Sequence, residues 1–159
     1  MADLLPIREA SDVIGWIVDR LAAISTGPFP DGMRHSLERI AIEEEPSASI
    51  SGKFSIDFES HAFQGIYTAN GMQEHQAVVA VRVGFFLGGG DGVSDRVTVN
   101  GRALDAMLRV SGVLEDSDYY GEAIENCEYQ GSQRSERQDQ AEIWTARFLV
   151  KWASGTVRS

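Results

Sequence analysis

The sequence predicts an α+β protein in which a mostly antiparallel β-sheet packs against two amphipathic helices and includes a long hairpin. Two segments carry apolar residues at the three- and four-residue spacing of a helix, and several others alternate apolar with polar residues, as half-buried strands do. Their order is helix, strands, helix, strands, which is typical of the α+β class. The 159 residues match the length of one domain, so we expect a single domain over residues 1–159.

The first predicted element is an amphipathic helix that ends near residue 24. Ser11 or Asp12 can cap it, because either side chain can accept a hydrogen bond from an unpaired backbone amide of the first turn. The apolar residues that follow recur at helical spacing and form one stripe: Val13, Ile14, Ile17, Leu21 and Ile24. Glycines and prolines at 27–32 end the helix, since proline lacks the amide donor.

Strands are predicted next, over 37–45, around 54–58 and from 77 to 87, where apolar and polar residues alternate. Asn70-Gly71 lies between the second and third of these strands. That pair tolerates the positive φ angles of a hairpin turn, so we expect the two strands to pair antiparallel around it. The tip of this hairpin is too polar to lie in the core of a monomer.

A glycine-rich break at 88–92 separates the hairpin from a second predicted helix, between residues 96 and 114. An acidic loop at 115–118 ends this helix. Its apolar side is predicted to consist of Ala103, Leu104, Met107, Leu108 and Val110.

The last part of the chain predicts a second hairpin. Alternation over 123–129 indicates one strand, and the polar segment 132–140 is expected to be the connection. The closing strand has one wholly apolar face, as expected for a strand that covers a core; this face consists of Trp144, Ala146, Phe148, Val150 and Trp152. Cys127 alternates with apolar neighbours and is predicted to be a small core residue.

Composition excludes several classes of function. The chain has 14 basic and 24 acidic residues and a net charge of −10, which argues against a general binder of duplex nucleic acid or of anionic membranes. A single cysteine cannot form an intramolecular disulfide. No apolar run is long enough for a transmembrane helix, and the first residues do not have the pattern of a secretory signal. We expect an intracellular or virion domain.

Motifs for catalysis, cofactors or metals are not recognised in the sequence. No lysine follows the glycines at 88–92, as a phosphate-binding loop requires. His35, His61 and His75 lack the usual ligand spacing, and although two of them flank the predicted hairpin, we expect surface histidines. The acidic runs 43–45 and 115–118 lack the alternating ligands of a calcium loop. The sequence therefore predicts a protein without catalytic activity, cofactor or metal.

The order of these elements and their residue patterns resemble those of phage tail terminator proteins, the small tail-completion proteins of long-tailed phages. The resemblance rests on the amphipathic helix 11–24, strand 37–45, the strand through 78–86, the helix that carries 102–108, and the closing strand 142–150. It covers nearly the whole chain.

The resemblance implies a ring, usually of six subunits, on the head-proximal end of the tail tube in the neck of the virion. Such a ring, assembled in the host cytoplasm, ends tube polymerisation and joins the tail to head-completion proteins. Genomic DNA passes through its channel without specific binding, and an acidic lining would keep phosphates from adhering. Subunit contacts are expected on the three polar connections, at Asn70, Gly71, Gly89, Asp91, Arg134 and Arg137.

Two other interpretations stay open at this point. Another phage neck or tail component, such as a head-closure protein or a tube subunit, has similar size and strand content. A small soluble α+β binding domain would need a concave site with convergent polar groups.

Overall fold

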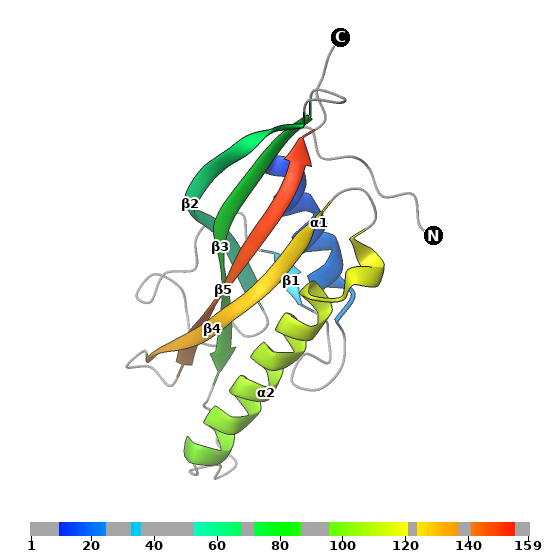
Figure 1. Ribbon diagram of the computed structural model, residues 1–159. Helices are drawn as coiled ribbons and strands as arrows, with labels where there is room; N and C mark the ends of the chain where they lie inside the picture. The colour runs from blue at the N-terminus through cyan, green and yellow to red at the C-terminus, as the bar shows by residue number, and fades with distance from the viewer. Residues whose placement is uncertain are drawn as a thin grey trace.

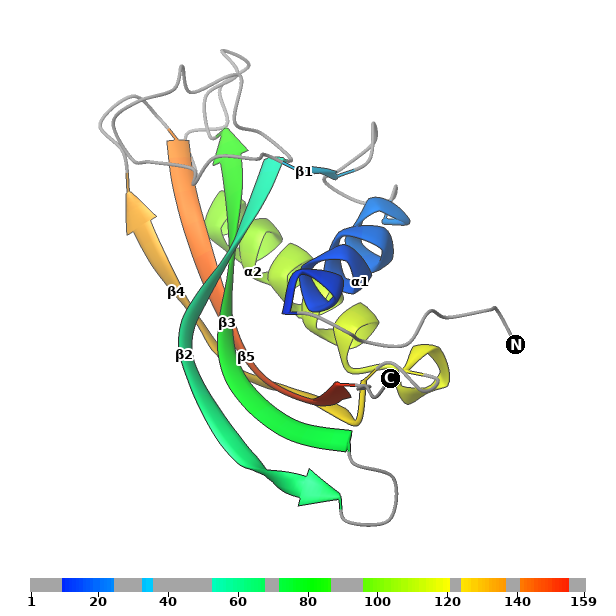
Figure 2. The same ribbon diagram turned by 90° about the horizontal axis from the view of Figure 1, so that it is seen from above.

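Two helices cover one face of a curved β-sheet in the computed structural model, which describes residues 10–24, 33–35, 53–67, 72–86, 96–120, 124–136 and 141–154 (Figure 1). The sheet bends around both helices, which lie on its concave side (Figure 2). In chain order the elements are α1 (Ala10–Ala22), β1 (Arg34–His35), β2 (Lys53–Tyr67), β3 (Met72–Phe86), α2 (Arg96–Leu114), the 3₁₀ helix η2 (Ser117–Tyr119), β4 (Asn126–Glu136) and β5 (Ala141–Ser154). The α+β class is confirmed.

Among the described residues, five strands form one sheet in the order β1-β2-β3-β5-β4. The four long strands pair antiparallel, and the two residues of β1 pair parallel with the start of β2. The predicted long hairpin is present as β2 and β3, whose pairing runs from Phe54 opposite Val83 to Tyr67 opposite Met72. The turn between them, with Asn70 and Gly71, lies outside the described residues, as do the predicted strand 37–45 and the break at 88–92.

The second hairpin differs from the prediction in where its connection lies. Residues 132–136 belong to β4 and pair with β5, so that the connection between the strands is reduced to 137–140. The pairing register shifts between Tyr129 and Ser132, and Gly131 has a φ of 114°. Such a bulge places an extra residue in one strand and interrupts the alternation of its side chains. For this reason the sequence predicts a loop for the polar residues after the bulge, although they belong to β4.

The core lies between the helices and the concave face of β3 and β5. Val79 and Phe148 pair across these central strands, and neither side chain is exposed. The predicted apolar face of β5 is confirmed, because all five of its members are buried. Both helices add their own fully buried residues to this cluster: Val13, Ile17, Leu21, Met107, Val110 and Leu114.

Helix α1 differs from the prediction at two points. It is already helical at Ala10, so Ser11 and Asp12 lie within its first turn instead of capping it. Trp16 shares the buried stripe, with 6% of its surface exposed, whereas Ile14 is only half-buried. Neither described helix is long and apolar enough to cross a membrane.

Helix α2 begins and ends within the predicted segment, but its buried side is rotated from the predicted one. Leu104 and Leu108 are 40% and 48% exposed, although both were expected to face inward. Consecutive residues of an α-helix lie about 100° apart around its axis. Because the buried stripe carries Ala103, Met107 and Val110, Leu104 and Leu108, each one position after a buried residue, turn toward solvent.

A candidate interaction surface on helix α2

The solvent-facing side of α2 carries an apolar strip. Leu104 and Leu108 are four residues apart and therefore lie above one another on the same side of the helix. Gly112 continues this row after one more turn, is exposed, and has no side chain to cover the helix backbone. We call Leu104, Leu108 and Gly112 the α2 strip. Two leucines exposed side by side on one helix face make this strip a candidate contact surface.

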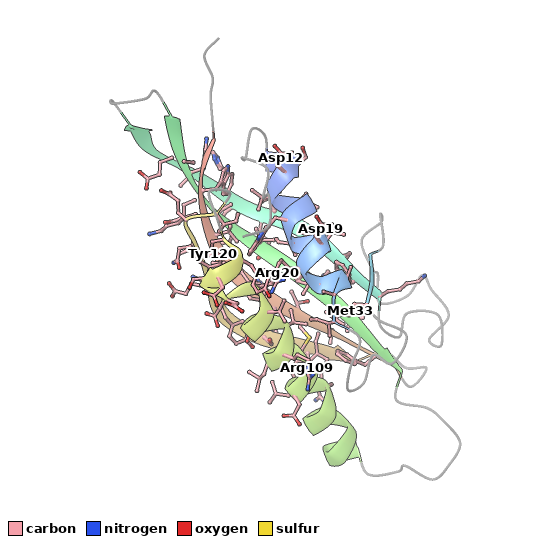
Figure 3. All side chains as sticks on the ribbon, turned by 90° about the vertical axis from the view of Figure 1, so that its right-hand side faces the viewer. Asp12, Asp19, Arg20, Met33, Arg109 and Tyr120 are labelled. Atoms are coloured by element: carbon pink, nitrogen blue, oxygen red, sulfur yellow. The ribbon has the colours of Figure 1, made fainter. Side chains whose placement is uncertain are left out.

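An open groove of about 550 Å³ runs beside the strip, where α2 approaches α1. Leu108, Gly112 and Val113 provide apolar or neutral lining, and the remaining lining residues are two arginines and two aspartates: Arg20, Arg109, Asp105 and Asp116. In Figure 3, Arg20 lies between the two helices and Arg109 lies on α2. Apolar residues next to both signs of charge are a combination that protein interfaces also contain.

Arg20 is held at this border by contacts with the end of α2 and with η2. Its guanidinium carbon lies 3.6 Å from the centre of the Tyr119 ring, a cation–π contact. Its Nη2 also donates a hydrogen bond to the backbone oxygen of Val113, at 3.5 Å. Trp16, one turn earlier in α1, donates from Nε1 to the backbone oxygen of Tyr119 at 3.0 Å. These contacts join α1 to the end of α2 and to the segment that follows it.

The segment after α2 is attached to the sheet through Tyr120. The backbone N–H of Cys127 donates to the Tyr120 hydroxyl at 3.1 Å, and that hydroxyl lies 3.1 Å from the Cys127 oxygen and 3.2 Å from the Glu115 oxygen, to which it can donate. The Tyr120 ring contacts Trp16 edge-on, with the ring centres 5.9 Å apart. These contacts, which follow the C-terminal end of α2, therefore hold the helix in its position on the sheet.

Cys127 is a buried core residue, as the sequence predicts, with 2% of its surface exposed. Burial raises the pKa of its thiol to about 12, and the carboxylate of Glu115 adds to this shift. A thiol with so high a pKa stays protonated near neutral pH and is a weak nucleophile.

Of the six residues predicted at subunit contacts, only Arg134 lies in the described part of the chain. It is exposed on β4, an edge strand of the sheet, opposite Trp144 in the register with β5. The prediction had placed it in a connection, which is wrong because β4 continues through the bulge to Glu136. Asn70, Gly71, Gly89, Asp91 and Arg137 lie outside the described residues.

The α2 strip is the part of this surface that sequence reasoning missed. Leu104 and Leu108 satisfy helical spacing as well as Ala103 and Met107 do, so periodicity alone assigns both pairs to one broad apolar side. The available signal was the width of that side, because an apolar side so wide exceeds the stripe that α2 buries, which carries Ala103, Met107 and Val110.

No protein-family model matches this chain. A search of curated proteins likewise finds no significant match.

Proposed function

We propose that the protein is a structural subunit of a phage tail, a tail terminator that forms a ring on the head-proximal end of the tail tube. In this function the ring ends tube polymerisation and offers a surface to head-completion proteins, in the neck of the virion after assembly in the host cytoplasm. This function needs no catalysis and no cofactor, because the ring acts only by binding. One face of the ring binds the last ring of the tail tube, and the opposite face does not bind a further tube ring.

The observation that carries the proposal is the α2 strip beside its charged groove. A ring of identical subunits needs two different complementary patches on each subunit, so that each copy binds the next head-to-tail and the rotation closes. Burying a half-exposed leucine stabilises an association by about 1 kcal/mol. Leu104 and Leu108 together with the charges of Arg20 and Arg109 supply one such patch.

The order of elements supports the same function. Helix α1, strand β3, helix α2 and the closing strand β5 follow one another in the order on which the resemblance to the family rests. The net charge of −10 is compatible with a channel through which DNA slides, since an acidic lining repels phosphates.

A direct test is the mass of the purified protein by light scattering over a concentration series. The wild-type chain is expected to form an oligomer of several 17.4 kDa subunits, whereas a Leu104→Asp, Leu108→Asp double variant stays monomeric because each buried carboxylate would lose its hydration. Ala22→Asp, at an exposed position of α1, is the matched control and assembles normally. A wild-type chain that is monomeric at every concentration contradicts the proposed role of this surface.

The groove also favours a second candidate, a small soluble binding domain. The groove is shallow and open to solvent, and Arg20 and Asp105 bring polar groups to it. This candidate predicts a monomer whose melting temperature rises when a small ligand is added, and the double variant would then leave the mass unchanged.

A further inference from the structure

Two histidines that are 14 residues apart in the sequence lie next to each other on β2 and β3, toward the end of the hairpin where β2 ends and β3 begins. In the antiparallel register His61 lies opposite Ala77, and His75 lies opposite Phe63. The two histidines are thus diagonal neighbours on the same face of adjacent strands. Nε2 of His61 and Nδ1 of His75 are 2.9 Å apart, close enough for a hydrogen bond between the rings.

The indole ring of Trp152, on β5, packs against both histidine rings. The His75 ring stacks on it with ring centres 5.3 Å apart and planes 21° apart, and the His61 ring centre lies 6.1 Å from it. Trp152 itself is 3% exposed and packs against Phe58. His61 is exposed and His75 is half-buried, so the pair has a fixed apolar base and an open side toward solvent.

The hydrogen bond requires that at least one ring be neutral, because two imidazolium rings carry only donors where they meet. Burial lowers the pKa of His75 below its ordinary value of 6.5, and the neighbouring His61 lowers it further. The ring that accepts the hydrogen bond presents a lone pair on the nitrogen that faces its neighbour, and neutral imidazole is the form that binds metals.

We propose that His61 and His75 form a binding site for a divalent transition-metal ion that takes two imidazoles side by side, with copper(II) bound most tightly and nickel(II) less so. Two nitrogens at about 2.0 to 2.1 Å from one ion and 90° apart are about 2.9 Å from each other, whereas a tetrahedral angle separates them by about 3.3 Å. The distance between Nε2 and Nδ1 in the hydrogen bond equals the nitrogen separation in tetragonal copper(II) or nickel(II), so binding requires only that both rings rotate to turn their lone pairs toward one ion.

Binding exchanges the hydrogen bond for two metal–nitrogen bonds. The ring that donates its proton must move this proton to its other ring nitrogen through solvent, while both nitrogens that face each other keep their lone pairs for the ion. The charge of the ion does not change. Within the described residues no group of three or more metal-ligating side chains is found. Two imidazoles are therefore the ligands that these residues supply, and we expect a modest affinity.

The experiment uses the full chain without any histidine tag and titrates copper(II) at pH 7.5 while recording tryptophan fluorescence. Because copper(II) quenches nearby tryptophans and Trp152 is one of three, saturable quenching of about one third of the signal is expected. His61→Asn and His75→Asn are each expected to weaken binding about tenfold or more. His35→Asn, at the remaining histidine of the chain, serves as the matched control and binds like the wild type.

A Trp152→Phe variant separates binding from its readout, because calorimetry should still detect the ion while the quenching is lost. Two results overturn the proposal: no saturable binding by wild type up to about 1 mM copper(II), or equal affinity in wild type and the His61→Asn variant. His61 is exposed, so this variant is expected to fold, and its thermal melt without metal verifies this.

Discussion

The hydroxyl of Tyr120 lies 3.1 Å from both the backbone nitrogen and the backbone oxygen of Cys127. Tyr120 follows η2 and Cys127 lies at the start of β4, so this contact joins the end of the second helix to the edge of the sheet. The orientation of α2, and with it the exposure of Leu104 and Leu108, depends on this attachment. Tyr120, which does not line the groove, therefore helps to shape the proposed contact surface.

Tyr120→Phe is expected to lower the free energy of unfolding by about 1 to 3 kcal/mol, because the buried N–H of Cys127 loses its hydrogen-bond acceptor. Urea unfolding measures the change. Tyr119→Phe is the matched control, since Tyr119 is 44% exposed and its contact with Arg20 uses the ring. A Tyr120→Phe protein as stable as wild type would show that this hydroxyl contributes nothing.

Phe148→Ala is expected to destabilise the monomer by about 3 to 5 kcal/mol, because its fully buried ring would leave a cavity between the helices and the sheet. Trp144→Ala, at 9% exposure, is predicted to cost a similar amount. Thermal melts report both changes, and a melting temperature unchanged by either substitution would refute the core assignment. Gln133→Ala, an exposed position on β4, should melt like the wild type.

Stability is expected to fall in alkaline solution because of Cys127. The folded thiol has a pKa of about 12 against an ordinary value of 9.0, so above about pH 9 the unfolded chain releases a proton that the folded chain retains. The stabilising contribution is complete below about pH 9 and is lost as the pH rises toward about 12. Urea unfolding at increasing pH tests this, and Cys127→Ala should show a weaker dependence. Equal slopes in the two proteins would contradict it.

Arg134→Glu is expected to weaken subunit association without unfolding the domain, because Arg134 is exposed on the edge strand β4. Light scattering gives the mass, and a thermal melt verifies the fold. Gln133→Glu is the control, since it adds a negative charge on the same strand but on the opposite face. Normal assembly of the Arg134→Glu protein would exclude Arg134 from the contact.

The sequence predicted the elements whose periodicity is uninterrupted. The closing strand β5 follows the predicted segment because its apolar residues alternate without a break from Trp144 to Trp152. Helix α2 spans the segment predicted between the glycine-rich break and the acidic loop. Strand β4 was cut short because the bulge between Tyr129 and Ser132 breaks the alternation. Such a break depends on backbone geometry, which a pattern of residue types does not contain.

The same limit applies to the two histidines. A two-residue turn at Asn70-Gly71 would place His75 opposite residue 66, five positions from His61. The observed pairing places His75 opposite Phe63, with register shifts on either side of Ser60–Phe63. Only the actual register brings the two rings together, because each shift of one residue changes the face on which a side chain lies.

Electron microscopy of the purified protein in negative stain tests the central claim most directly. Our account predicts closed rings with a central channel for wild type and for Ala22→Asp, and their loss in the Leu104→Asp, Leu108→Asp variant. Long tubes would instead indicate a tail tube subunit. Isolated monomers in the wild-type sample at every concentration would contradict ring formation through helix α2.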